Sequence, residues 1–377
     1  MTTKRLKIAL VSDAVLPFHK GGKEVRIFHL AQELIRLGQQ VDIYTMKWWD
    51  GGDTYEHEGM TFHALCRFHP LYVGKRRSIA EGLLFGAACF KLIRYQFDVL
   101  ETDHMPYFPL FAAKVVSLLK RKPLFATWHE VVGLRAWREY LGFKGGTIAA
   151  VIERLSVHMP DHIIAVSAHT QEQLRSVLHY KGPLSLVSNG IDAERIAAVA
   201  PAALSSDVIY VGRLIPHKNV DLLLRAVAEL RESRPNIHCV VVGTGPQQHK
   251  LEALVRELGL ERHVTMTGRL ESSDDLFALM KSSKVFVSPS IREGFGITVL
   301  EAYAAGLKVV TVRHQDNAAQ HLVQKETGLV CEPTAAAIAE AIQTLLGEAD
   351  AGKVLALDAS VFDWSAQAVA LKEVYGL

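Results

Sequence analysis

Residues 7–46 have the sequence KIALVSDAVLPFHKGGKEVRIFHLAQELIRLGQQVDIYTM, and their pattern decides the fold. An apolar run at 7–13 is followed by two glycines and by residues 24–38, in which apolar side chains recur every three or four positions. That period is typical of an amphipathic helix, and the run at 40–46 is typical of a buried strand. Strand, helix and strand in this order predict a βαβ unit of a parallel sheet.

The same alternation continues along the whole chain. Further strands are expected at HIIAVSA, LSLVSNG, DVIYVGR, HCVVVGTG, HVTMTG, KVFVSPS and KVVTV, with amphipathic helices between them. Because 377 residues exceed what one hydrophobic core usually supports, we expect an α/β protein of two doubly wound domains. The predicted domains are residues 1–192 and 193–358, and a helix at 359–377 is expected to pack back on the first domain.

Charge and cysteine content restrict the possible partners and compartment. Residues 1–190 carry 24 Lys and Arg against 17 Asp and Glu, whereas the remainder carries 18 against 23. A basic half suits an anionic partner, although ordinary solvation explains it equally well. The four cysteines are widely spaced and form no CxxC pair, which argues against a zinc site or a disulfide framework. We therefore expect a cytoplasmic protein without a metal site.

A basic and apolar stretch in the first half has two interpretations. Residues 79–97 are apolar but contain too many charges for a membrane-spanning helix. With the basic cluster before it, the stretch suits peripheral contact with an anionic membrane at its inner face. The alternative is a core helix flanked by solvated charges. No nucleic-acid partner is expected. The charged residues concerned are Lys75, Arg76, Arg77, Glu81, Lys91 and Arg94.

Two cations follow a predicted strand of the second half. In VGRLIPHKNVD, Arg213 and Lys218 stand between that strand and a helix that Asn219 is expected to cap. Open parallel sheets bind ligands at the carboxyl ends of their strands. A diphosphate is the ligand expected there, because Arg offers a planar fork of donors and Lys a point charge.

Glycines follow two other predicted strands. Gly21 and Gly22 precede the first helix, and Gly243 with Thr244 occurs in VVVGTGP. Backbone N–H groups in such turns can approach an anion at a helix N-terminus, but each turn is equally well explained as a simple tight turn. The GxGxxG pattern of dinucleotide-binding proteins is absent, which disfavours a nicotinamide enzyme.

The stretch REGFGITVLEA at 292–302 places two carboxylates around a glycine turn. Glu293 precedes the turn, and Glu301 is expected about one turn into the following helix. An unpaired carboxylate in apolar surroundings is costly, so Glu301 is either solvated or bound by donors. A carboxylate accepts two hydrogen bonds side by side, and the vicinal hydroxyls of ribose supply them.

In their order along the chain, these motifs resemble the retaining GT-B glycosyltransferases of family GT4. The motifs are HKGGKE, WHE, SNGID, VGRLIPHKN, VGTGP, TGRL and EGFGITVLEA. The resemblance covers nearly the whole chain and is most specific in the second half. It implies two Rossmann-like domains that face a central cleft, with the acceptor bound by the first domain and a nucleotide sugar by the second.

The resemblance also implies roles for single residues. Arg213 and Lys218 would bind the donor diphosphate, Glu301 the ribose, and Glu293 would lie near the donor sugar. His129 would contact that sugar near the reacting centre, and these residues other than Glu301 form the expected catalytic set. The residues expected to contact the donor are Gly21, Gly22, Arg213, Lys218, Gly243, Thr244, Arg269, Leu270, Glu293, Gly294, Phe295, Gly296 and Glu301. Glu130 follows His129 where relatives often have Asp.

The expected reaction is metal-independent transfer of a sugar from a nucleotide diphosphate sugar, with no cofactor. No DxD motif is present; ETD at 101–103 and the pair Asp274 and Asp275 are the nearest to one. The acceptor is expected to be a glycan, a lipid-linked group or a small molecule. Two alternatives remain open: a nucleotide-sugar epimerase on the same scaffold, and a non-catalytic nucleotide-binding module.

Overall fold

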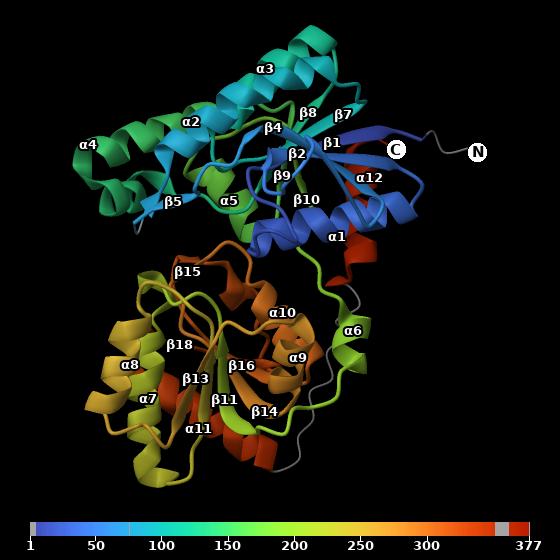
Figure 1. Cartoon of the computed structure of the whole chain (residues 1–377). Coiled ribbons are helices and arrows are strands. Elements are labelled where there is room, and N and C mark those ends of the chain that lie inside the picture. Colours follow the sequence, from blue (N-terminus) through green and yellow to red (C-terminus); the bar gives the residue numbers. More distant parts are fainter. Residues whose placement is uncertain (1–4, 75, 351–361, 377) are drawn as a thin grey trace. The chain divides into compact units, whose positions relative to one another are not determined.

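The computed structural model describes residues 5–74, 76–350 and 362–376. They form two compact α/β units (Figure 1). Unit 1 takes in the described residues up to Gly190 and those from Trp364 onward, and unit 2 takes in those from Ile191 to Asp363. The predicted boundary between residues 358 and 359 and the side chain of Lys75 lie outside the described residues.

Unit 1 contains an eight-stranded sheet in the order β10-β9-β8-β7-β1-β2-β4-β3. The edge strand β3 runs antiparallel to β4, and the other neighbours are parallel. The strands are β1 (Lys7–Val11), β2 (Gln40–Lys47), β3 (Thr54–His57), β4 (Met60–Arg67), β7 (Val99–Asp103), β8 (Leu124–Trp128), β9 (His162–Ala165) and β10 (Leu184–Leu186), with a separate hairpin of β5 (Tyr72–Val73) and β6 (Arg76–Arg77).

The helices of unit 1 cover both faces of this sheet. Successive residues of β1 point to opposite faces: Ile8 belongs to the core with α1, and Ala9 to the core with α2 and α3. Because both faces are buried, the parallel strands are apolar almost throughout. The helices are α1 (Gly22–Arg36), α2 (Ile79–Ala88), η1 (Cys89–Arg94), α3 (Phe108–Lys120), α4 (Gly133–Ser156), α5 (Ala168–Ser176) and α12 (Trp364–Val374).

The last helix, α12, packs in the core of unit 1. Trp364 and Leu371 share a buried cluster with Leu30 and Leu34 of α1. The hydroxyl of Tyr375 donates a hydrogen bond to the buried carboxylate of Glu101 on β7. The expected fold class, in which a C-terminal helix returns to the N-terminal half, is therefore confirmed.

Unit 2 contains a six-stranded parallel sheet in the order β13-β12-β11-β14-β16-β18. Its strands are β11 (Ser206–Val211), β12 (Cys239–Val242), β13 (Val264–Gly268), β14 (Ser283–Ser288), β16 (Lys308–Val312) and β18 (Gly328–Cys331), with a separate pair of β15 (Arg292–Glu293) and β17 (Asp316–Asn317). Its helices are α6 (Ala193–Ala198), η2 (Pro216–Lys218), α7 (Val220–Ser233), α8 (Gln248–Glu257), α9 (Ser273–Lys281), α10 (Ile297–Ala304), η3 (Ala318–Leu322) and α11 (Ala335–Asp350).

Each sheet reverses its strand order at one place, and this place positions the candidate site. In unit 1 the chain passes from β1 to β2 on one side, and β7 lies on the other side of β1. In unit 2 the chain passes from β11 to β12, and β14 lies on the other side of β11. A crevice forms at the carboxyl ends of strands where the order reverses, and open α/β sheets bind their ligands there.

Candidate functional site

In unit 2, the structure brings two predicted site residues into contact at the switch point. Lys218 ends η2, which follows β11, and Glu293 lies in β15, which follows β14. Their side chains form an ion pair, and each is about one-sixth exposed. The backbone N–H of Ile291 donates to the carbonyl of His217 at 3.0 Å, which joins the two segments. An ammonium group is thus held at the sheet edge, and a carboxylate partly neutralises it.

Arg213 lies two residues beyond the end of β11 and is exposed. The predicted cap at Asn219 is wrong. Asn219 occupies the N-cap position of α7, but its side chain accepts no capping hydrogen bond from the described residues. Its backbone is left-handed, with φ 48° and ψ 40°, whereas a capping side chain normally needs extended backbone at this position.

The glycine turn after β12 packs closely against the turn after β11. A Cβ on Gly243, whose φ is +137°, would overlap the carbonyl oxygen of Gly212. The N–H of Gly243 donates to the carbonyl of Gly268 at 2.9 Å, so this N–H already has an acceptor. Thr244 is exposed beside it, and the predicted donor contacts Arg269 and Leu270 directly follow Gly268, the last residue of β13.

The turn at 293–296 is held by its neighbours in the sequence and in space. Glu293 pairs with Asn317 in the two-stranded β15–β17 sheet. Gly296 has φ 103°, and a Cβ there would lie 2.7 Å from the Cβ of Ala319, so only glycine fits without a shift. Gly294 is half-buried, Phe295 is buried, and α10 begins at Ile297. Glu301 is half-buried one turn into that helix, as predicted.

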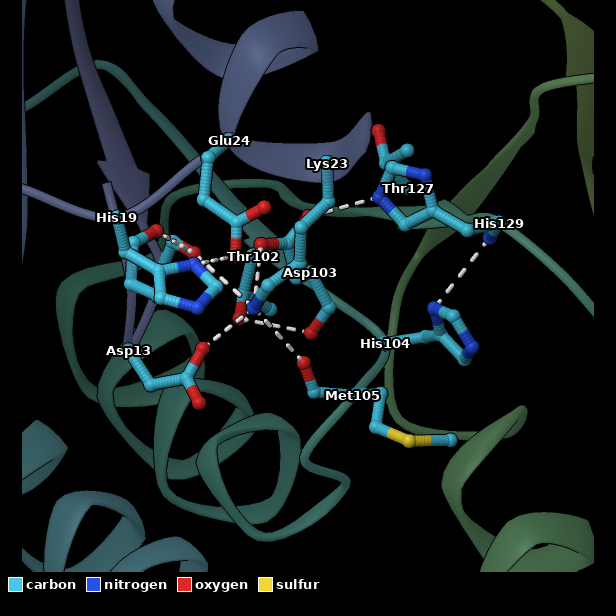
Figure 2. A network of polar contacts seen from close by, with 12 residues as sticks. Asp13, His19, Lys23, Glu24, Thr102, Asp103, His104, Met105, Thr127 and His129 are labelled. Atoms are coloured by element: carbon cyan, nitrogen blue, oxygen red, sulfur yellow. Dashed lines mark hydrogen bonds and ion pairs between the residues drawn. The ribbon is translucent and has the colours of Figure 1, made fainter. Parts of the chain in front are cut away.

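In unit 1, His129 is the first residue after β8, and it contacts a carboxylate at the end of β7. Its Nε2 lies 3.0 Å from Oδ1 of Asp103 (Figure 2). Its backbone N–H donates to Nδ1 of the buried His104 at 3.3 Å. Burial, with nearby His129, lowers the pKa of His104 to about 3, so this ring stays neutral and accepts that hydrogen bond.

The glycines before α1 have their own local explanation. Gly21 is the N-cap residue, and a Cβ there would overlap the carboxylate of Glu24 in the first turn. Glu24 is buried and lies 3.3 Å from Nδ1 of His19. The anion next to the start of α1 is therefore this side chain, and the approach of a donor diphosphate to Gly21 and Gly22 stays a prediction.

Sequence reasoning missed the charged residues that surround His129. In the sequence, Asp103 stands out only as part of a possible metal motif, whereas in the structure it binds His129 and lies 3.4 Å from the ammonium of Lys23. Lys23 also pairs with Asp13, two residues after β1. The available signal was position, because Asp13 and Asp103 both lie at the ends of strands that meet at the switch point. Among the described residues, no group of three His, Cys, Asp or Glu side chains is arranged to hold a metal ion.

A second buried carboxyl group near Asp13 makes unit 1 sensitive to pH. Glu81, on α2, is 1% exposed, and neither carboxylate oxygen has a hydrogen-bond partner among the described residues. Arg77 approaches it at 3.9 Å and itself pairs with Asp13. Burial, with Asp13 adding to it, raises the pKa of Glu81 to about 8.

Glu81→Gln is therefore expected to stabilise the protein more at pH 8 than at pH 5. In the unfolded chain Glu81 ionises near its ordinary pKa, whereas in the folded protein it keeps its proton up to about pH 8. The wild type thus loses stability as pH rises through that window, by roughly 1 to 3 kcal/mol, and the Gln variant does not. Urea unfolding at both pH values measures this, with the exposed Glu139→Gln as control. An equal effect of Glu81→Gln at both pH values would contradict the prediction.

Two family models match the chain in succession. Residues 20–195 match the model described as Glycosyltransferase Family 4, and residues 199–355 match the model described as Glycosyl transferases group 1. The first match lies mainly in unit 1 and the second in unit 2.

Two relatives illustrate the sequence similarity. The chain is 30% identical to a glycogen synthase of Mycobacterium tuberculosis over 268 residues, which are 67% of this chain and 63% of that relative. The match therefore spans less than two thirds of that relative. The chain is 24% identical to the D-inositol 3-phosphate glycosyltransferase of Corynebacterium glutamicum over 409 aligned positions, which cover 98% of this chain and 96% of the relative.

A solved structure matches the fold over nearly the whole chain. Sucrose-phosphate synthase from Thermosynechococcus elongatus superposes with a TM-score of 0.81 and 22% identity. The match covers 99% of this chain and 98% of the other. At this identity the likeness is one of fold.

Proposed function

Because the chain belongs to the GT4-type glycosyltransferases and has their GT-B fold, we propose that it transfers a sugar from a nucleotide diphosphate sugar to an acceptor hydroxyl. In this proposal unit 2 binds the donor and unit 1 binds the acceptor, which is a glycan, a lipid-linked group or a small molecule. Transfer retains the anomeric configuration and needs neither a metal nor a cofactor. The observation that carries the proposal is the Lys218–Glu293 pair at the switch point of unit 2.

The chemistry requires cations where the leaving group departs. The bond between the anomeric carbon and the β-phosphate oxygen breaks, negative charge grows on the diphosphate, and positive charge grows on the sugar ring. Fixed cations stabilise that transition state because they need no reorganisation as the charge develops. Arg213 and Lys218 supply them, and Glu293 holds Lys218 in place before the donor arrives.

Retention follows from attack on the same face of the sugar. The acceptor oxygen bonds to the anomeric carbon on the side that the phosphate leaves, and the acceptor proton passes to the departing phosphate oxygen. No protein nucleophile is needed, so a stable glycosyl adduct on Glu293 would speak against this route.

Two measurements test the proposed function. Melting shifts with UDP, GDP and ADP identify the base, because a ligand that binds the folded state raises its melting temperature. Donor consumption is then followed with and without an acceptor extract. Consumption that depends on the extract and yields a glycosylated product supports transfer. Isomerisation of the donor alone would indicate an epimerase, and binding without turnover would indicate a non-catalytic module.

We also propose that unit 1 contacts an anionic membrane through the outer side of α2 and η1. Five large apolar side chains repeat at helical spacing there, and Leu83, Leu84 and Phe90 are each about half exposed. The opposite side of the same segment is buried against α3. The segment is thus a core helix on one side and an apolar surface on the other. The five side chains are Ile79, Leu83, Leu84, Phe90 and Ile93.

The charge around this surface matches anionic lipid. Arg94 and Arg121 are exposed nearby, whereas of the seven acidic residues at 79–156, a range described throughout, Glu139 alone is exposed. Basic residues next to an anionic surface contribute on the order of 1 kcal/mol each. No helix in the described ranges is both long and apolar enough to cross a bilayer. The similarity to a human phosphatidylinositol N-acetylglucosaminyltransferase, 26% identical over 93% of this chain and 70% of the relative, supports a lipid partner.

The pair Leu83→Asp and Leu84→Asp is expected to weaken binding to anionic vesicles about tenfold or more. Each leucine loses apolar burial on the order of 1 kcal/mol and gains a charge that the lipid repels. Co-sedimentation with vesicles of phosphatidylcholine, with and without phosphatidylglycerol, at low salt measures this. Leu204→Asp, an exposed leucine of unit 2, is the matched control. Equal wild-type binding to both vesicle types would refute the membrane contact, and self-association lost in the variant would indicate a second copy of the chain as the partner.

A further inference from the structure

We propose that Lys23 is a positioning residue that fixes the hydrogen-bonding state of His129 through Asp103. The inference rests on the proposed function, in which His129 contacts the donor sugar. Lys23 is the second residue of α1, and its side chain reaches the carboxyl ends of β1 and β7, where the strand order of unit 1 reverses.

The ammonium group of Lys23 is surrounded by oxygen atoms. It pairs with the fully buried Asp13, and it lies 3.3 Å from Oγ of Ser12, 3.3 Å from the carbonyl of Met105 and 3.4 Å from Oδ2 of Asp103 (Figure 2). Its side chain is 14% exposed. A buried ammonium group is costly unless paired, and here two carboxylates from different strands compensate it. Its position is therefore strongly determined.

The two oxygens of Asp103 bind different partners. Oδ2 faces Lys23 and Oδ1 faces Nε2 of His129, so the carboxylate bridges a fixed cation and an imidazole ring. Asp103 is 5% exposed. Although burial opposes ionisation, Lys23 and the His129 hydrogen bond together hold the pKa of Asp103 well below its usual range. Asp103 therefore remains an acceptor at any working pH.

An ionised Asp103 determines which nitrogen of His129 carries the proton. The hydrogen bond to Oδ1 places the proton on Nε2, which leaves Nδ1 of the neutral ring as an acceptor. His104 adds no competing charge, because it is neutral and accepts the backbone N–H of His129. In this state Nδ1 can accept a hydrogen bond from a sugar hydroxyl. Lys23 acts on the ring without touching the substrate.

The direct test is the ring protonation of His129 in Lys23→Met. Nitrogen chemical shifts of ring-labelled histidine, assigned by the signal lost in His129→Asn, report the tautomer above the histidine pKa. The wild type is expected to show the Nε2–H form, and Lys23→Met a mixture of both forms, because Asp103 is no longer held in place. An unchanged tautomer in the variant would overturn the inference. Should Lys23→Met fail to fold, Lys23→Gln keeps a polar side chain without the charge and is expected to give the same change.

Kinetics separate positioning from a loss of stability. Lys23→Met is expected to lower kcat about 10- to 100-fold with the donor KM nearly unchanged, because small misplacements at the reacting centre carry penalties of that size. Lys23→Arg is expected to restore much of the activity. Lys114→Met, which removes a more exposed ion pair with Asp161 in the same unit, is the matched control and should leave kcat unchanged.

The two readouts also separate this inference from the proposed function. If the chain transfers no sugar but the tautomer changes in Lys23→Met, the positioning role stands and the proposed function fails. If transfer occurs and neither the tautomer nor kcat responds to Lys23, the inference fails and the proposed function stands.

Discussion

Lys218→Met is expected to lower kcat by about 10²- to 10³-fold, the usual loss when one preorganised group at a developing negative charge is removed. The cation is needed most as the diphosphate leaves, so kcat falls more than donor affinity. Lys218→Arg is expected to recover only part of the activity, since a planar guanidinium does not fit the position of an ammonium group. Steady-state kinetics with the donor identified by the melting shifts measures this.

The ion pair with Glu293 sharpens this test. Lys218→Met leaves the Glu293 carboxylate facing the diphosphate without compensation, so the double variant Lys218→Met, Glu293→Gln is expected to bind donor more tightly than Lys218→Met alone. Lys284→Met, which removes the Lys284–Asp207 ion pair in the same unit, is the matched control. A Lys218→Met variant that is folded and retains wild-type kcat would show that Lys218 does not contact the leaving group.

Glu301→Ala is expected to raise the donor KM about 100-fold. The variant loses two hydrogen bonds from the ribose hydroxyls to a charged acceptor, each contributing about 1.5 to 3 kcal/mol. Glu301→Gln keeps one acceptor oxygen and should lose less. Isothermal titration with the nucleoside diphosphate measures the affinity, and Glu257→Ala, on the exposed side of α8, is the control.

The nucleotide itself supplies a second, independent measurement on Glu301. The wild type should bind the 2′,3′-dideoxynucleotide far more weakly than the ribonucleotide, because the carboxylate then loses its partners. Glu301→Ala should bind the two nearly equally. The same ratio of affinities in both proteins would place the ribose elsewhere.

The sequence predicted the parts of the site that depend on local pattern. Apolar periodicity predicted both sheets, and residues directly after predicted strands, such as Arg213, are at strand ends in the structure. The helical position of Glu301 followed from the glycine turn before it. Such features depend on neighbours in the sequence, so one chain is enough to read them.

Other features depend on contacts between distant residues. Lys23 and Asp103 are 80 positions apart, and only the sheet order brings them together at one switch point. Asn219 has a typical capping side chain, but the tight η2 turn before it imposes left-handed backbone. Gly243 is required by the approach of the neighbouring turn at Gly212, which a turn pattern does not reveal.

The most direct test of the central claim is a crystal structure of the protein with its nucleoside diphosphate bound. The account predicts that the phosphates lie within hydrogen-bond distance of Arg213 and Lys218 and that the ribose hydroxyls lie on Glu301. Phosphates bound at another place, with Lys218 still engaged by Glu293 and neither cation in contact with the ligand, would contradict it.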